Sequence, residues 1–218
     1  MTLNLQVMKK TGLLVVVLIA MTLITAAFAP RPKDWIALFD GKSLNGWKVG
    51  NNASTFSIEN GSIKVAGPVA HLFYDGPVSN HQFTNFEFKA EVMTMPGSNS
   101  GIYFHTIFQE AGFPSKGYEV QVNNSHGDDK RTGSLYDIVD VKEVYVPDNT
   151  WYTEYIKVEG KHVIVKINNT VVVDYTEPEH PLRKDNHPDR LISSGTFALQ
   201  GHDPKSVVYF RNIMVKPL

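Results

Sequence analysis

The sequence predicts an all-β fold in which two antiparallel sheets pack face to face as a jelly-roll sandwich. Short runs rich in β-branched and aromatic residues follow one another from Trp35 onward, and turn residues separate them. We find no segment with helical spacing and helix caps. Many short strands joined by turns are typical of sandwiches and jelly rolls.

The strands can be placed from local signals. Segments 56–58 and 62–65 flank Asn60-Gly61, and Asn-Gly between two β-type runs is a strong hairpin signal. Apolar and charged side chains alternate over 83–95, which predicts a half-buried strand. Further strands are expected over 101–108, 117–123, 151–158, 162–167, 171–173, 195–201 and 207–215. The core is expected to contain Phe86, Phe88, Phe104, Val120, Leu199 and Phe210.

Two long connections interrupt this series of strands. They cover residues 124–149 and 177–194, and the second is rich in Pro, His and Asp. Loops of this length in a compact domain are usually functional rims or lids. We therefore expect them to border the site.

Composition narrows the class of protein. The chain has 218 residues, 42% of them hydrophobic and 20% charged, and no cysteine. This suits one domain with a sizeable core and excludes a disordered chain. The formal net charge of −1 gives no basis for a nucleic-acid partner.

The N-terminal residues of the chain have the pattern of a separate targeting segment. Lys9 and Lys10 precede an apolar run from 13 to 23, and Ala27-Phe28-Ala29 has the small-x-small form of a cleavage site. We predict a signal peptide over 1–29 and a mature domain over 30–218. Because Pro30 disfavours cleavage, an uncleaved N-terminal anchor is the alternative, and it would be the domain's contact with a membrane. In both cases the domain is expected outside the cytoplasm, in a bacterial periplasm or secreted.

Three predicted strands each place polar side chains on one face, opposite an apolar face. Successive side chains on a strand point to opposite sides, so the face of each residue can be read from its position. Carboxylates and amides bind sugar hydroxyls in pairs, and aromatic rings stack on sugar C–H faces. The polar set comprises Tyr103, His105, Glu119, Gln121, Gln200 and His202.

The same segments carry a family resemblance. The opening Trp35–Trp47 resembles that of the 3-keto-disaccharide hydrolase domain family, and Gly97–His105 resembles the central motif of that family. The remaining matches, in order, are 117–121, 132–136, 199–202 and 208–213, so the resemblance covers 35–218. His105 departs from the pattern, because many members carry Arg there. The resemblance implies a concanavalin A-like lectin/glucanase fold and action on glycosides whose carbon 3 is a ketone.

This chemistry needs a general base, a group that stabilises an enolate and a proton donor. A 3-keto group acidifies the hydrogen on carbon 2, so a base can remove it, the group on carbon 1 can leave, and water can add later. Glu119 or a histidine is the candidate base. A histidine or a bound divalent cation would stabilise the enolate oxygen. The catalytic and metal candidates are Glu119, His105 and His202. The candidate substrate-binding residues are Asn99, Tyr103, Gln121, Tyr136, Gln200 and Arg211.

Two functions remain open at this point. Glu119 is the one clear carboxylate on the polar face, which favours elimination over a conventional glycosidase with two carboxylates. The alternative is a non-catalytic carbohydrate-binding domain with the same fold, because the polar face would serve both. A carbohydrate is the expected partner in each case.

Overall fold

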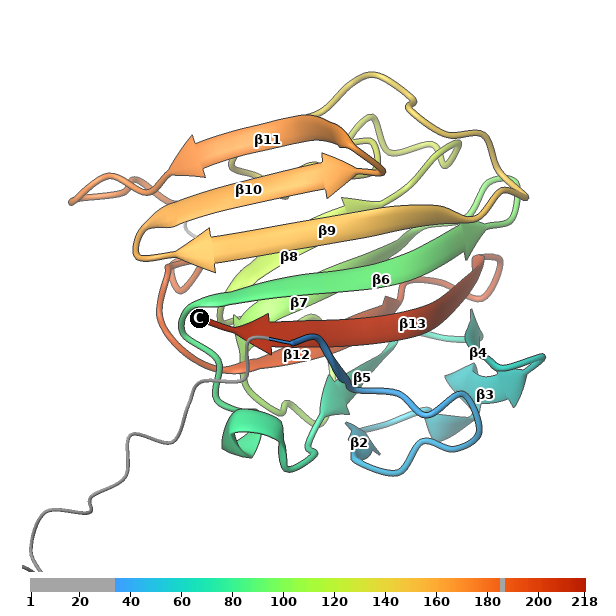
Figure 1. Cartoon of the computed structure of the whole chain (residues 1–218). Helices are drawn as coiled ribbons and strands as arrows, with labels where there is room; N and C mark the ends of the chain where they lie inside the picture. Colours follow the sequence, from blue (N-terminus) through green and yellow to red (C-terminus); the bar gives the residue numbers. More distant parts are fainter. Residues whose placement is uncertain (1–33, 185–186) are drawn as a thin grey trace, which may run out of the picture. The chain divides into compact units, whose positions relative to one another are not determined.

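Antiparallel pairing joins every pair of neighbouring strands in the described part of the chain, as predicted. The computed structural model describes residues 34–184 and 187–218, so the predicted signal segment lies outside the described residues. Two sheets of eight and five strands are stacked (Figure 1). The prediction of an all-β sandwich of two antiparallel sheets is confirmed.

The larger sheet has the order β11-β10-β9-β6-β13-β4-β3, with β1 paired to β13. Its strands are β1 (Ile36–Ala37), β3 (Phe56–Glu59), β4 (Ser62–Ala66), β6 (Phe86–Thr94), β9 (Tyr152–Glu159), β10 (His162–Ile167), β11 (Thr170–Thr176) and β13 (Val207–Pro217). The smaller sheet has the order β2-β5-β12-β7-β8. Its strands are β2 (Trp47–Val49), β5 (Ala70–Tyr74), β7 (Ser100–Thr106), β8 (Tyr118–Val122) and β12 (Thr196–Gly201).

Two short 3-10 helices, η1 (Ala53–Thr55) and η2 (Val78–His81), complete the described elements. No described helix is long and apolar enough to cross a membrane. Strand β5 was not predicted, because its sequence Ala-His-Leu-Phe-Tyr shows no apolar–polar alternation. All five of its residues are buried.

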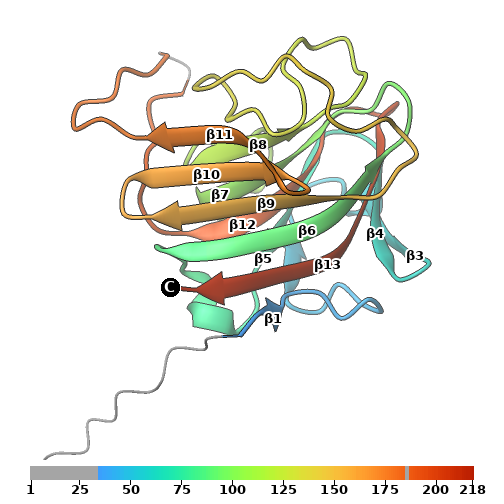
Figure 2. The ribbon, with the colours of Figure 1, turned by 45° about the horizontal axis from the view of Figure 1, so that its top comes forward.

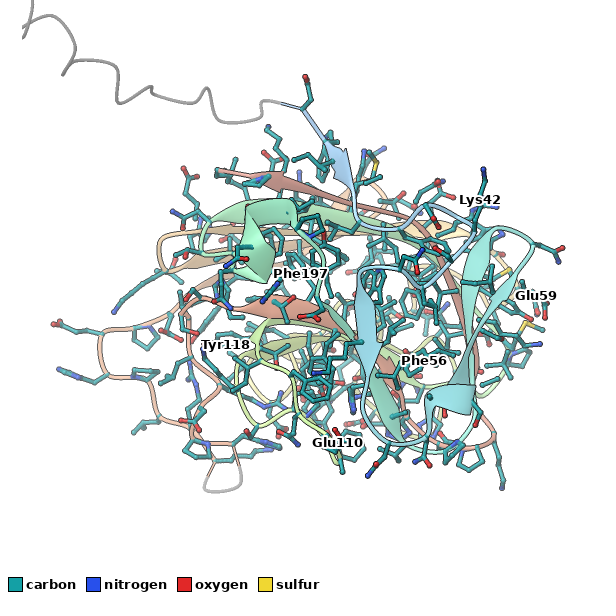
Figure 3. The ribbon with its side chains drawn as sticks, turned by 90° about the horizontal axis from the view of Figure 1, so that it is seen from below. Lys42, Phe56, Glu59, Glu110, Tyr118 and Phe197 are labelled. Carbon is teal, nitrogen blue, oxygen red and sulfur yellow. The ribbon has the colours of Figure 1, made fainter. Side chains whose placement is uncertain are left out.

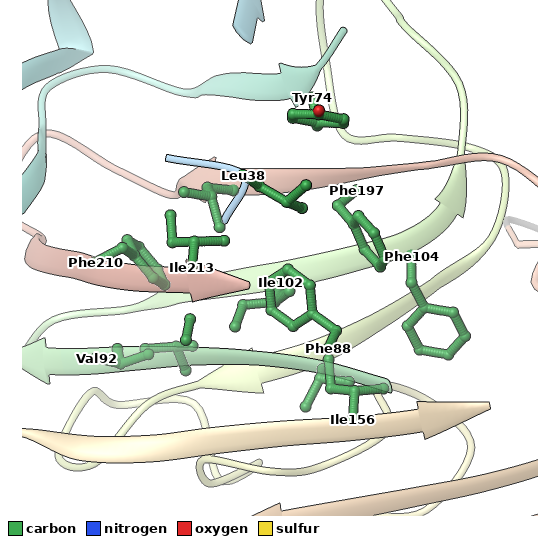
Figure 4. Packing of buried hydrophobic residues seen from close by; sticks show 14 of the residues in the cluster. Leu38, Tyr74, Phe88, Val92, Ile102, Phe104, Ile156, Phe197, Phe210 and Ile213 are labelled. Carbon is green, nitrogen blue, oxygen red and sulfur yellow. The ribbon is translucent and has the colours of Figure 1, made fainter. Parts of the chain in front are cut away.

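The core lies between the two sheets and is dominated by aromatic rings. All six predicted core residues are fully buried, which confirms that prediction. Figure 4 shows Phe88, Phe197 and Phe104 packed between the layers, and the ring centroids of Phe88 and Phe197 lie 4.6 Å apart. Figure 3 shows Phe197 inside the domain, whereas Lys42 and Glu59 lie at its periphery. The apolar faces of β7, β8 and β12 are thereby used for packing, and their other faces point away from the core.

One carboxyl group is also enclosed in this core. Glu154 lies on the core-facing side of β9, between Tyr152 and Ile156, and is fully buried. Neither of its carboxyl oxygens has a hydrogen-bond partner in the described structure. Burial raises the pKa of Glu154 well above its ordinary value. The folded protein therefore holds this carboxyl in its neutral form.

Glu154→Gln should change how stability depends on pH. The pKa of Glu154 is raised in the folded state, so its stabilising effect is complete below the ordinary value of 4.5 and is lost as pH rises toward the folded value. The free energy of unfolding of the wild type should fall with pH by up to about 1.4 kcal/mol per unit more than that of the variant. Urea denaturation between pH 5 and pH 8 measures this, with the exposed Glu143→Gln as control. Identical pH dependence in wild type and Glu154→Gln would contradict a buried neutral carboxyl.

Candidate active site

A cavity of about 360 Å³ opens over the outer face of the smaller sheet. Strands β7, β8 and β12 form its floor, and the two long connections that follow β8 and β11 contribute to its walls (Figure 2). Its lining residues are Tyr103, Phe113, Glu119, Gln121, Tyr136, His187, Arg190, Gln200 and His202. Six of the nine predicted site residues are in this set, so most of the site predicted from the sequence lies in one cavity.

Strand order explains why these side chains meet. Strand β7 lies between β8 and β12, and Tyr103 is paired with Glu119 on one side and with Ala198 on the other. Because Val120 and Leu199 point into the core, their sequence neighbours Glu119 and Gln200 must point outward. The sequence predicted this parity for each strand. The adjacency of the three strands comes from the structure.

Glu119 is an almost fully enclosed charged group of the cavity, with 4% of its surface exposed. The Tyr103 hydroxyl donates to its Oε2 at 2.8 Å, and Gln200 Nε2 donates to its Oε1 at 2.8 Å. A guanidinium nitrogen of Arg190 lies 3.6 Å from Oε2. Burial raises the pKa of Glu119, although Arg190, Tyr103 and Gln200 oppose this by stabilising the charge. A carboxyl with a raised pKa that lines a cavity, with hydrogen-bond donors and a guanidinium beside it, is a candidate for proton transfer.

Tyr103 and Gln200 form a closed network with this carboxylate. Gln200 Nε2 also donates to the Tyr103 hydroxyl at 3.1 Å. Burial raises the pKa of Tyr103 well above its ordinary value, and the charge of Glu119 adds to this effect. The phenol therefore stays protonated and remains a donor to Glu119.

The amide of Gln121 extends the polar floor toward Asn99. Gln121 Nε2 donates to Asn99 Oδ1 at 3.1 Å, which places Asn99 behind the cavity lining. The Oε1 atoms of Gln121 and Gln200 have no hydrogen-bond partner in the described structure. A buried acceptor without a donor costs free energy, so both oxygens are suited to receive hydroxyl donors from a ligand.

Two predicted residues lie elsewhere, and the first is His105. The prediction that it shares the cavity with Tyr103 is wrong, because its φ of 57° is left-handed and interrupts the alternation of β7. Its Nε2 lies 3.0 Å from the Thr84 carbonyl oxygen, and its Nδ1 accepts the Ser193 N–H at 3.2 Å. Burial lowers the pKa of His105 to about 4. His105 is thus a neutral structural residue and does not join Glu119 in a catalytic or metal site.

The second is Arg211. It lies on β13 in the larger sheet, where its Nε donates to Glu91 Oε2 at 2.7 Å and its guanidinium lies 3.9 Å from the centre of the Trp151 ring. The prediction that Arg211 borders the cavity is therefore wrong, because the site belongs to the other sheet. Arg190, from the connection after β11, supplies the cavity with a guanidinium instead.

The connection that carries Arg190 is anchored by a buried ion pair. Glu177 accepts hydrogen bonds from the Tyr118 hydroxyl, from Arg183 at 3.1 Å and from the Ile192 N–H at 3.0 Å. Arg190 in turn donates to the Tyr136 carbonyl oxygen at 2.7 Å, which joins the two long connections. The sequence placed these loops at the rim but did not assign Arg190 or His187 to the site, and the length of the loops was the one signal for them. Phe113, from the connection between β7 and β8, was also missed.

A group suited to a cation lies at the edge of the cavity. His126, His202 and Asp203 each offer a ligand atom, and these atoms lie within 4.8 Å of one another. This set differs from the predicted one of Glu119, His105 and His202, since only His202 is common to both.

Residues 34–216 match the family model described as a 3-keto-alpha-glucoside-1,2-lyase-like domain. The chain belongs to this family. The family resemblance noted in the sequence is thereby confirmed, and the family indicates a carbohydrate-active domain.

Individual relatives agree with this assignment. The chain is 27% identical, over 229 aligned positions, to a 3-keto-disaccharide hydrolase of Bacteroides thetaiotaomicron, covering 84% of this chain and 78% of the relative. A crystal structure of a proposed glycosyl hydrolase from Parabacteroides distasonis superposes with a TM-score of 0.71 at 23% identity, over 84% of this chain and 94% of that one. A carbohydrate-binding module from Bacillus subtilis has a TM-score of 0.52 at 13% identity, over 78% and 95% of the two chains. The similarities to these two solved structures show the fold alone.

Gly101→Ala should disturb the site without unfolding the domain. A Cβ at Gly101 would lie 2.6 Å from Glu119 Oε1, so the carboxylate would have to move off its donors. If Glu119 takes part in a reaction on a carbohydrate, activity should fall roughly tenfold or more, because a displacement of about 1 Å at a reacting group has a large effect on rate. Circular dichroism should stay that of the wild type. Gly127→Ala is the matched control, since nothing lies within 4 Å of its added Cβ. Full activity in Gly101→Ala would show that the position of Glu119 is not critical.

Proposed function

We propose that this domain cleaves the glycosidic bond of 3-keto-glycosides by elimination followed by hydration, with net hydrolysis. The observation that carries the proposal is the environment of Glu119. It is the only carboxylate among the described residues that line the cavity, and it faces Arg190 and the amides of the floor. Family membership supports the 3-keto-glycoside as substrate class.

The proposed reaction begins at carbon 2. Glu119 takes the proton that the neighbouring ketone has acidified, the bond from carbon 1 to the leaving oxygen breaks, and a double bond forms between carbons 1 and 2. Arg190 supplies positive charge in the cavity, which is what a developing enolate requires. His202 gives a proton to the leaving oxygen. Water then adds to carbon 1 and gives one proton to His202, while Glu119 protonates carbon 2, so both groups end in their starting states.

Ordinary glycoside hydrolysis fits the cavity less well. Retaining and inverting glycosidases use two carboxyl groups on opposite sides of the bond that breaks. Here Glu119 has no carboxylate partner among the described lining residues. An elimination needs only one base, because the substrate's ketone provides the activation that the second carboxylate would otherwise supply.

Phe113 supports a sugar as the ligand. It is 46% exposed at the cavity, and its ring lies edge-on to His71, with the centroids 5.6 Å apart. The Gln109 side chain fixes its loop by donating to the carbonyl oxygens of Ala111 and Phe113 at 2.7 and 2.9 Å. An exposed, fixed aromatic ring beside buried amides matches the two faces of a sugar, one apolar and one rich in hydroxyls.

Glu119→Gln should separate an enzyme from a binding module. The substitution keeps the size of the side chain and removes its ability to take a proton. An enzyme should lose turnover of a 3-keto-disaccharide by roughly a hundredfold or more, since general base catalysis contributes about 10²–10⁴. A binding module would show no turnover in the wild type and would lose only affinity, by about 1.5–3 kcal/mol.

Released sugar is measured across a panel of 3-keto-disaccharides, with and without a chelator. Glu91→Gln, a carboxylate on the other sheet, is the matched control and should keep wild-type turnover. Unchanged turnover in Glu119→Gln would remove Glu119 from the chemistry.

We also propose that the domain is exported, on the basis of the basic, apolar and small-residue pattern of residues 1–29. Fractionation of the native bacterium should place the protein in the periplasm or medium, with a mature N-terminus near Pro30 by mass spectrometry. An intact Met1 in the membrane fraction would support the anchor. A cytoplasmic protein with an intact N-terminus would contradict export.

A further inference from the structure

His202 is hydrogen-bonded to the residue that follows it. Its Nδ1 lies 2.9 Å from Asp203 Oδ2. The same carboxylate accepts the Ser206 hydroxyl at 2.6 Å through Oδ2 and the Lys205 N–H at 2.8 Å through Oδ1. Burial opposes ionisation of Asp203, but these hydrogen bonds outweigh it and lower its pKa to about 2. The carboxylate is therefore charged and fixed in place.

This hydrogen bond determines where His202 carries its proton. An ionised carboxylate can only accept, so Nδ1 of His202 must be the protonated nitrogen. Its Nε2 is then the ring nitrogen that remains to contact a ligand. Since His202 lines the cavity that Glu119 also lines, this nitrogen is available to a ligand there.

The neighbouring His126 has the opposite arrangement. Its Nδ1 accepts the Asp128 N–H at 3.1 Å and lies 3.3 Å from Asn99 Nδ2, so its proton is on Nε2. The two imidazole rings meet edge to face, with centroids 5.4 Å apart. The hydrogen bonds thus occupy both Asp203 oxygens and His126 Nδ1, and favour proton transfer over cation binding as the role of this group.

We propose that Asp203 is a positioning residue that makes His202 act as an acid in the elimination and as a base in the hydration. His202, protonated on both nitrogens, donates its Nε2 proton as the bond from carbon 1 to the leaving oxygen breaks. The neutral ring then accepts a proton at Nε2 from the water that adds to carbon 1, which restores the starting state. The proposal rests on the proposed function and explains how one domain completes both steps.

Asp203 also shapes the connection from β12 to β13, because its Oδ1 accepts the N–H groups of Lys205 and Ser206. The experiment must separate this turn from the effect on His202. Asp203→Asn does so, since the amide oxygen can still accept from the turn while its NH₂ faces His202 as a donor. In this variant, Nδ1 of His202 must accept the hydrogen bond that the new amide group donates, and the ring proton moves to Nε2.

The effect of Asp203→Asn on catalysis can be measured with two substrates that differ in their leaving group. A nitrophenolate leaves without being protonated, whereas a sugar alkoxide needs an acid. Asp203→Asn should release nitrophenol from a nitrophenyl 3-keto-glucoside at close to the wild-type rate. Cleavage of a 3-keto-disaccharide should fall by roughly a hundredfold or more, the contribution expected of a general acid. The unsaturated ketone should accumulate and be detected by its ultraviolet absorbance, because its hydration is slow. Lys205→Ala, which leaves the His202–Asp203 pair intact, is the matched control and should behave as wild type with both substrates.

The ¹⁵N chemical shifts of the His202 ring give a readout independent of turnover. The wild type should show the proton on Nδ1 and Asp203→Asn should show it on Nε2. Equal losses on both substrates, or a wild-type His202 protonated on Nε2 alone, would overturn the proposal. So would a stoichiometric metal whose removal abolishes turnover and whose binding is lost in His126→Ala. A wild-type protein that cleaves neither substrate would overturn the proposed function itself, and the catalytic role of the pair with it.

Discussion

The burial of the Glu119 carboxylate is the constraint on which the rest of the site depends. A charged group removed from water is tolerated only when donors and a counter-charge surround it. Tyr103 and Gln200 provide the donors because β7, on which Tyr103 lies, is flanked by β8 and β12. Arg190 provides the counter-charge, and Gly101 leaves the space that the carboxylate occupies. The same arrangement that stabilises the buried carboxylate holds it beside the cavity, where the proposed reaction needs a proton acceptor.

The strands of the sandwich position the residues at the floor of the cavity, and the two long connections position residues of its walls. Strand β8 contributes to both, because Tyr118 and Glu119 point to opposite sides of it. Glu119 lines the cavity, whereas the Tyr118 hydroxyl donates to Glu177, which holds the connection that carries Arg190. Two consecutive residues of one strand thereby connect Glu119, the proposed base, to the loop that supplies its counter-charge. Changes at the loop anchor should therefore affect the chemistry as well as stability.

The sequence allowed the sandwich and most of the floor to be predicted, because alternation along a strand assigns each side chain to a face. The prediction was wrong or incomplete where the alternation along a strand is interrupted, where the sequence shows none, or where the residue does not lie on a strand. His105 adopts a left-handed backbone conformation that alternation cannot anticipate, and β5 is buried on both faces. Arg211 was misplaced because strand order is a long-range property that local patterns do not contain. Arg190 comes from an irregular loop, where no periodic signal exists.

The proposed reaction begins by removal of the hydrogen on carbon 2. The most direct test is to supply a 3-keto-disaccharide deuterated at carbon 2 of the keto sugar and to measure both the rate and the deuterium content of the released keto sugar. We expect slower turnover than with the unlabelled substrate, and loss of deuterium to the extent that Glu119 exchanges its deuteron with water before it protonates carbon 2, after correction for exchange of the substrate alone. Equal rates together with full retention of deuterium would contradict elimination and would indicate direct displacement at carbon 1.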